Sequence, residues 1–353
     1  MPWQAIHVHY SDDNQDRLIL DAVRPLFERV AADVPEAYFT PHWRRGPHLR
    51  LLFRAGDEVF HDVVRPAARD VVGAFLRDRP ATTKLDEARV LPLHERLAER
   101  EGEKGPLRPF QPNNTLTVER YDPRLHMLGN RETAELQARF YVAATPLAFA
   151  MIEGTPDPGD RRRLAFALLI ATVHAFTATG LAQSYATFRS HAEAFLATTP
   201  GGEEYRSEWD AQYTRYAERF ETELVEALAT VDGHRDSVPF LRQWVDTMRP
   251  VERDVRALQH VGTLHMPPAD LSAPRSEFHR ALAASPGAAA VLQGPEFTVF
   301  RQLINYFYLH LTRIGLSAME RNALCHIAAN TAERHYGMTA LEMFAASLTD
   351  TRR

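Results

Sequence analysis

The chain has 353 residues, of which 45% are hydrophobic and 25% are charged, and its formal net charge is −5. These values are typical of a folded globular protein and contain no low-complexity bias. The negative net charge argues against general nucleic-acid binding, so no nucleic-acid partner is expected. The single cysteine, Cys325, excludes an internal disulfide and fits a reducing cytoplasmic location.

Strands are expected mainly in the first third of the chain. Alternating apolar residues from Trp3 to Tyr10 predict a strand at the N-terminus, with no signal peptide before it. A hairpin follows, in which Trp43 closes one strand and His48 to Arg54 forms the next. The basic turn Arg44-Arg45-Gly46-Pro47 joins these two strands. Thr115 to Tyr121 predicts a further strand.

Helices are expected elsewhere, because apolar residues recur at helical spacing. The early helices are predicted over Asp16 to Val34, Glu58 to Leu76 and Lys84 to Arg100, and Gly102 to Asn114 reads as an exposed loop. From Glu132 onward the chain reads as almost entirely helical. The expected breaks are Pro156 to Pro158, Pro200 to Gly202, Pro250, Pro267 to Pro268 and Pro286 to Gly287.

This order of elements predicts an α+β fold, in which a small N-terminal antiparallel sheet packs on a large, mainly helical body. We expect a single domain over residues 1–353, with a strand-rich part at 1–130 and a helical part at 131–353. The longest apolar run, Leu164 to Ala182, contains His174 and four threonines, so it predicts a core helix and no membrane partner. Cys325 lies in a helical apolar stretch and is expected to be a buried, inert thiol.

The sequence lacks the common cofactor motifs. There is no phosphate-binding glycine loop, dinucleotide fingerprint, His-Glu-x-x-His or nucleophile elbow. His7 and His9 could share one strand face, but no third ligand is apparent, so packed or surface histidines are expected there. We therefore expect no metal and no cofactor, and any catalysis should rest on positioning, hydrogen bonding and proton transfer.

A late helix combines aromatic and polar side chains. One face is predicted to carry Phe297, Arg301, Ile304, Tyr308 and Leu311. Gln302 and Asn305 are predicted on an adjoining face, and His310 and Arg313 continue from Tyr306. Such an aromatic stripe is usually plain core. Polar groups among aromatic residues are also what a small-molecule or heterocycle site contains, so both interpretations stay open.

Three segments carry a family resemblance. Gly46 to Leu51 reads Gly-Pro-His-Leu-Arg-Leu, Val118 to Tyr121 reads Val-Glu-Arg-Tyr, and Tyr308 to Arg313 reads Tyr-Leu-His-Leu-Thr-Arg. In this order they resemble the C-terminal elimination domain of lantibiotic dehydratases, also called the thiopeptide-type bacteriocin biosynthesis domain. The three segments span most of the chain, so the resemblance implies an elimination-domain-like fold throughout.

Two departures from that pattern bear on the reaction. Elimination domains remove glutamate from glutamylated Ser or Thr, and their motif has a second arginine where this chain has Leu52. The first histidine of their late-helix motif is Tyr308 here, and the chain has no room for a glutamylation domain. A stand-alone protein with such a site resembles the thiopeptide pyridine synthases. That resemblance implies a cofactor-free formal [4+2] aza-cycloaddition that macrocyclises a leader-bearing precursor peptide with thiazoles and dehydroalanines.

The resemblance also implies roles for individual residues. Tyr308 would donate a hydrogen bond or proton to the reacting amide. Glu119 would accept a proton and Arg120 would orient it or the peptide, although a strand-edge ion pair is an equal alternative. Arg50 and His48 would bind peptide carbonyls or assist loss of water. The other expected substrate contacts are His310, Gln302, Asn305, Phe297, Arg301 and Arg313, with Arg44 and Arg45 docking an acidic leader.

Two other functions remain open from the sequence. One is a subunit of a split, tRNA-dependent dehydratase that still eliminates glutamate. The other is a non-catalytic scaffold that binds the precursor peptide. A solvent-exposed hairpin without a function is the corresponding alternative for the basic turn.

Overall fold

The computed structural model describes residues 1–267 and 275–350, and the chain forms two compact units. The first unit holds residues 1–154 and 312–315, and the second holds the remaining described residues. The predicted break at Pro267 to Pro268 is only partly covered, since Pro268 lies outside the described residues. The 24-residue helix α7 (Arg131–Gly154), expected in the helical part, belongs to the first unit.

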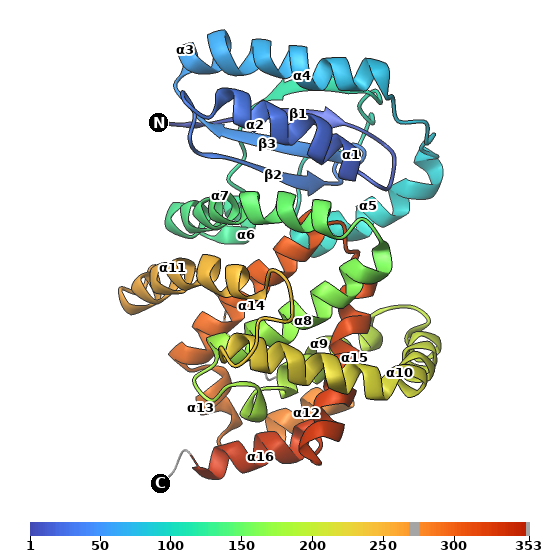
Figure 1. Ribbon diagram of the computed structural model, residues 1–353, viewed down its shortest axis with the longest axis vertical. Coiled ribbons are helices and arrows are strands. Elements are labelled where there is room, and N and C mark those ends of the chain that lie inside the picture. The colour runs from blue at the N-terminus through green and yellow to red at the C-terminus, as the bar shows by residue number, and fades with distance from the viewer. Residues whose placement is uncertain (268–274, 351–353) are drawn as a thin grey trace. The chain divides into compact units, whose positions relative to one another are not determined.

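The first unit is built around a four-stranded antiparallel sheet (Figure 1). Its spatial order is β2-β3-β1-β4, which confirms the predicted N-terminal sheet. In the hairpin turn, Arg45 and Gly46 have positive φ angles of 63° and 99°. Glycine adopts such positive φ angles readily because it has no Cβ. The strands are β1 (Trp3–His9), β2 (Ala37–His42), β3 (His48–Arg54) and β4 (Thr115–Glu119).

Two helices of this unit contain a π-helical turn. Each π turn ends immediately before an Arg-Pro pair, with Pro25 and Pro66 as the prolines. Proline lacks an N–H and its ring clashes with the carbonyl four residues earlier, so a wider turn before it relieves the clash. The segments are α1 (Asp16–Leu18), η1 (Ile19–Val23) and α2 (Arg24–Val30), then α3 (Asp57–Val59), η2 (Phe60–Val64) and α4 (Arg65–Asp78).

The sheet has one apolar face and one polar face. Val8, Leu51 and Phe53 are fully buried on the apolar face, which α2 and α4 cover (Figure 1). Helix α7 lies beside the edge strand β2, where the Tyr38 and Tyr141 rings stack with centroids 5.1 Å apart. The remaining helices of this unit are α5 (Glu87–Glu101) and α6 (Leu125–Leu128).

The described part of the second unit consists of helices and their connections. Its central helix α8 (Pro158–Phe176) buries every residue from Leu164 to Val173, which confirms the predicted core helix. Among the described residues, no helix has both the length and the hydropathy that a membrane crossing requires. The other elements are η3 (Leu181–Gln183), α9 (Ala186–Thr198), α10 (Gly202–Val231), α11 (Leu241–His260), α12 (Glu277–Ala284), α13 (Ala288–Leu292), α14 (Pro295–Arg313), α15 (Ala318–Tyr336) and α16 (Ala340–Asp350).

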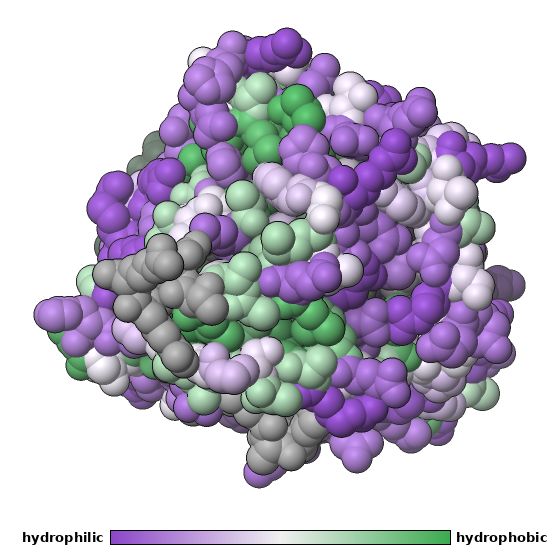
Figure 2. Space-filling view, turned by 90° about the horizontal axis from the view of Figure 1, so that it is seen from below, coloured by the Kyte–Doolittle hydropathy of each residue, from purple (hydrophilic) through white to green (hydrophobic). Residues whose placement is uncertain are grey.

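The face of the molecule seen in Figure 2 is mainly polar. Figure 2 shows one face on which hydrophilic residues surround a smaller group of apolar residues. Cys325 is buried, and burial raises its pKa to about 12. The prediction of a buried thiol is therefore confirmed, and a raised pKa disfavours the reactive thiolate.

Candidate functional site

Strand register gathers histidines on the polar face of the sheet. His9, His48 and His42 stand opposite one another on β1, β3 and β2, and His7 stands opposite Arg50. Opposed residues of antiparallel strands point to the same face. We call this set of five residues the histidine face. The His48 ring lies 4.7 Å from the His7 ring and 5.3 Å from the His42 ring, centroid to centroid.

These imidazoles are packed against one another and are neutral at pH 7. Burial lowers the pKa of His7 to about 3 and that of His9 to about 4. Burial also lowers the pKa of His42 and of His48, and nearby Arg50 acts in the same direction. The described residues contain no group of three or more possible metal ligands. The pairing of His7 with His9 on one face is confirmed.

This packing predicts acid sensitivity. Below pH 6.5 the unfolded chain protonates its histidines, whereas folded His7 and His9 stay neutral down to about pH 4. The unfolded state then binds more protons, so the free energy of unfolding should fall as the pH drops. The expected slope is about 1.4 kcal/mol per pH unit for each such histidine. Urea unfolding at pH 7.5, 6 and 5 measures it, and His9→Gln should give a shallower slope. An identical slope in that variant would contradict this origin.

Arg50 is a buried cation on the histidine face. Its residue is only 8% exposed, and its buried Nε has no hydrogen-bond partner among the described residues. Burial, together with Arg124 and Arg44, lowers its pKa to about 10, so it remains charged at pH 7. A buried guanidinium without a paired acid is costly. This arrangement suits an anion or a strongly polarised carbonyl oxygen from a ligand.

The nearby acids are already engaged by other arginines. Arg44 pairs with Glu103 at 3.2 Å, and Arg124 pairs with Glu101 at 2.6 Å and Glu103 at 3.1 Å. Arg45 donates from Nε to the Pro109 carbonyl at 3.0 Å. Arg44 and Arg45 therefore anchor the 103–111 loop, which leaves less of their charge for an acidic leader. Their docking role stays a prediction.

Strand β4 places Glu119 on the histidine face of the sheet. Thr117 stands opposite His7, and Glu119 stands opposite Ala5 one step along. Glu119 is half-buried, whereas Arg120 is exposed just beyond the strand. No ion pair between these two residues occurs in the described part of the chain, so the strand-edge pair is not formed. Glu119 shares the face of Arg50 but lies on a different strand, with β1 between them.

In the second unit, Tyr308 of α14 lies among groups from two other helices, α9 and α15. Its hydroxyl is 3.2 Å from the Cys325 thiol of α15, and its ring meets the His191 ring of α9 edge-on at 4.9 Å. The Arg321 guanidinium lies 5.6 Å from the same ring. We call these four residues the tyrosine cluster. Burial, reinforced by Cys325, raises the pKa of Tyr308 well above its usual value, so the phenol stays protonated and can act as a donor.

A second histidine, His279, adjoins this cluster. Burial and the neighbouring His279 lower the pKa of His191 to about 4. His279 lies 3.0 Å from the Ser190 hydroxyl and 2.7 Å from that of Ser276. The sequence did not predict these surroundings of Tyr308. They come from helices α9, α12 and α15, which span more than one hundred positions along the chain, so no local spacing pattern links them.

The other residues expected on α14 separate into different environments. Arg301 is half-buried and donates to the Pro267 carbonyl at 2.7 Å, and Phe297 is half-buried. Asn305 is exposed, whereas Gln302 is 4% exposed. Helix α14 therefore does not present all of its predicted polar residues on one surface.

Two predicted contact residues are fully packed. His310 is 0% exposed and its ring lies 4.8 Å from that of Trp244. Arg313 is 1% exposed, and it donates to Thr145 Oγ1 at 2.5 Å and lies over the Phe39 ring. A substrate would have to displace this packing to touch either side chain. Their substrate roles stay predictions, and their surroundings favour structural ones.

Comparison with known proteins identifies the family. Residues 3–332 match the C-terminal family of lantibiotic biosynthesis dehydratases. The chain belongs to this family. The resemblance inferred from the three motifs is thereby confirmed. No curated protein sequence matches the chain.

Solved structures extend this finding. The pyridine synthase TbtD from thiomuracin biosynthesis is 37% identical, with a TM-score of 0.81 over 96% of this chain and 99% of TbtD. TsrL is 20% identical, with a TM-score of 0.72 over 98% of each chain. The tRNA-dependent lantibiotic dehydratase MibB from Microbispora sp. 107891 is 16% identical, with a TM-score of 0.51, and this chain covers 29% of it. The latter two likenesses show the fold alone, and together the three confirm the predicted α+β architecture.

Proposed function

We propose that this chain is a thiopeptide pyridine synthase. The observation that carries the proposal is its 37% identity to the pyridine synthase TbtD along nearly the full length of both chains. The substrate would be a leader-bearing peptide with thiazoles and two dehydroalanines. A formal [4+2] aza-cycloaddition would join the dehydroalanines, and loss of water and of the leader would then leave a pyridine in the macrocycle.

The tyrosine cluster supports the role of Tyr308. One amide must tautomerise to its imidic acid to form the azadiene, which requires a donor at the amide oxygen. Tyr308 stays protonated, because burial raises its pKa. Its neighbour His191 is neutral, since burial lowers its pKa to about 4. A neutral donor in a desolvated site stabilises charge that develops on the oxygen.

The histidine face supports binding of the peptide backbone. Arg50 would donate to a peptide carbonyl or to the hydroxyl that leaves as water, and His48 would flank it. Glu119 would act as a proton acceptor for the peptide bound at this face, because it lies on the same face as Arg50 and forms no ion pair with Arg120 in the described part of the chain. Orientation of two parts of one peptide can supply roughly 7–11 kcal/mol of the barrier in favourable cases.

The residue beside Arg50 argues against glutamate elimination. Leu52 follows Arg50 by two positions along β3, so its side chain points to the histidine face. It stands opposite Ala5 and Tyr38 and is 4% exposed. The second arginine of the elimination motif would occupy this position. This part of the face is apolar and packed instead, so it offers no charged group to a glutamate carboxylate.

Two substrates distinguish the candidate functions. Purified protein is incubated with a leader-bearing thiazole peptide that contains either two dehydroalanines or a glutamylated serine. We expect cyclisation of the first peptide and no conversion of the second, as measured by mass spectrometry. Formation of dehydroalanine from the glutamylated serine would support the split dehydratase. Binding of both peptides without turnover would support the scaffold.

A further inference from the structure

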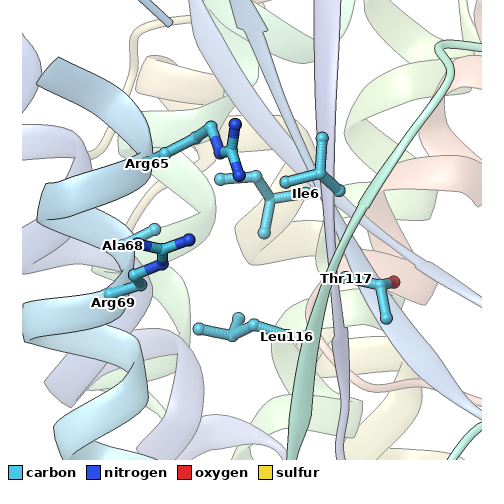
Figure 3. A pocket seen from close by; sticks show the side chains of 7 residues that line it. Ile6, Arg65, Ala68, Arg69, Leu116 and Thr117 are labelled. Atoms are coloured by element: carbon cyan, nitrogen blue, oxygen red, sulfur yellow. The ribbon is translucent and has the colours of Figure 1, made fainter. Parts of the chain in front are cut away.

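The outer edge of the sheet forms a groove with helix α4. Strand β4 is an edge strand, because within the described sheet it pairs only with β1. A pocket of about 230 Å³ lies between β4 and α4. Figure 3 shows Arg65 and Arg69 of α4 on one side, and Ile6, Leu116 and Thr117 on the other. We call this feature the β4 groove.

The edge of β4 lacks two of the usual protective residue types, proline and lysine. Its sequence, Thr-Leu-Thr-Val-Glu, contains no proline or lysine and favours extended structure. Val118 on this strand is 50% exposed. An edge strand presents unpaired backbone N–H and C=O groups, so it can accept another extended segment as a fifth strand.

Arginines line the helical wall of the groove. Arg65, Arg69 and Arg77 recur at multiples of four residues and so form one stripe along α4. Gly73 occupies the remaining place in that stripe, and a Cβ there would lie 3.5 Å from the Arg77 guanidinium and 3.9 Å from Leu116. The stripe therefore faces the β4 side of the helix. It spans about 18 Å, close to the roughly 17 Å of a five-residue strand.

The charge of this stripe is poorly compensated. Arg69 and Arg77 are exposed and form no ion pair with another residue in the described part of the chain, and Arg65 contacts His61 rather than an acid. The groove also has an apolar lining, formed by Ile6, Ala68 and Leu116. A matching ligand is an extended peptide with acidic side chains toward α4 and apolar contacts along this lining.

We propose that the β4 groove binds an acidic, extended segment of the peptide substrate by strand addition. This inference rests on the proposed function, in which the leading part of the peptide is discarded and can serve only for binding. Binding energy from such a non-reacting part can hold the reacting residues in place. The occupant is a peptide strand that runs beside β4, with acidic residues at alternate positions over the arginine stripe.

The test uses fluorescein-labelled synthetic peptides in which Asp or Glu alternates with Val or Leu, and matched peptides with Lys at the acidic positions. Fluorescence anisotropy measures binding to the full chain. We call the double substitution Arg65→Glu with Arg69→Glu the groove variant. It should weaken binding of the acidic peptide at least about tenfold and remove most of the salt dependence of that binding. The matched control is Arg96→Glu with Arg100→Glu, an exposed pair with the same spacing on α5, which should change binding less than about twofold.

Backbone chemistry tests strand addition separately. Alternate N–H groups of an added strand point toward β4, so N-methylation of one alternate set should abolish binding and methylation of the other set should not. Equal binding of both isomers would overturn the proposal. Unchanged binding of the acidic peptide in the groove variant would also overturn it. A dimer that dissociates in that variant would show that a second copy occupies the edge, which contradicts the proposal as well.

Turnover keeps this inference distinct from the proposed function. In single-turnover cyclisation, the groove variant should require at least about tenfold more peptide for half-maximal rate. Its rate at saturation should match that of the parent protein. If neither the parent protein nor any variant cyclises a peptide, the proposed function is wrong. If anisotropy then still shows that peptide binding depends on Arg65 and Arg69, the inference about the β4 groove remains supported. Cyclisation that is insensitive to the groove variant at every peptide concentration rejects the groove alone.

Discussion

Replacing Tyr308 by Phe is expected to slow cyclisation by roughly 100-fold or more, the usual scale for a general acid–base group. The change keeps the ring, its edge-on contact with His191 and the helix propensity, and it removes only the hydroxyl. Peptide affinity should change much less, because the interaction strengthens mainly in the transition state. Single-turnover conversion and peptide binding on folded protein measure the two effects.

The control for this prediction is Tyr213→Phe. That substitution also removes one phenol hydroxyl in the same unit, which donates to the Asn330 carbonyl at 3.1 Å. Each variant should lose about 0.5–1.5 kcal/mol of stability for one hydrogen bond. Only the Tyr308 variant should lose turnover. A Tyr308→Phe protein that folds, binds peptide and cyclises at close to the parent rate would remove Tyr308 from the mechanism.

Replacing Arg50 by Met is expected to separate stability from activity. The substitution removes a buried charge without a bound partner, so the free energy of unfolding should stay the same or rise by about 1–3 kcal/mol. The value of kcat/KM should fall about 30-fold or more, because a buried charged contact to the substrate is worth about 2 kcal/mol or more. Urea unfolding and steady-state kinetics provide the measurements.

Arg313→Met provides the contrast in stability. Arg313 is also buried, but it donates to Thr145 Oγ1 and to the Tyr141 carbonyl. Its replacement removes two buried hydrogen bonds from a charged donor, so unfolding should become easier by about 1–3 kcal/mol. If Arg50→Met destabilises the protein as much as Arg313→Met and retains full activity per folded molecule, Arg50 is a structural residue and not a ligand for the substrate.

The sheet was predictable because its signals are local. The hairpin around Gly46 combines a turn signal with flanking apolar strands, and β1 shows plain alternation. The π turns before Pro25 and Pro66 were not predicted, because periodicity indicates a helix but not how a proline within it is accommodated. The predicted bounds of the early helices differ from the observed ones by a few residues, as is usual for frayed ends. The predicted break at Pro250 is wrong, because α11 continues through this proline from Leu241 to His260.

The candidate site was predictable only in part. Arg50 and Tyr308 emerged from motifs in which residues are close in sequence. The four histidines of the sheet face depend on strand register, which pairs His9 with His48 and His48 with His42. His191 reaches Tyr308 only through helix packing. Conversely, the helical period placed His310 beside the candidate site, but packing against Trp244 buries it, because tertiary contacts decide which face of α14 is open.

The most direct test of the proposed function is the mass balance of the reaction catalysed by purified protein. A leader-bearing peptide with thiazoles and two dehydroalanines is incubated with the protein after dialysis against a chelator, with no nucleotide added. We expect a macrocycle whose mass equals that of the peptide minus the leader fragment and one water, formed by the parent protein and greatly slowed in Tyr308→Phe. Unchanged peptide after prolonged incubation, or activity that returns only when a metal or nucleotide is supplied, would contradict a cofactor-independent pyridine synthase.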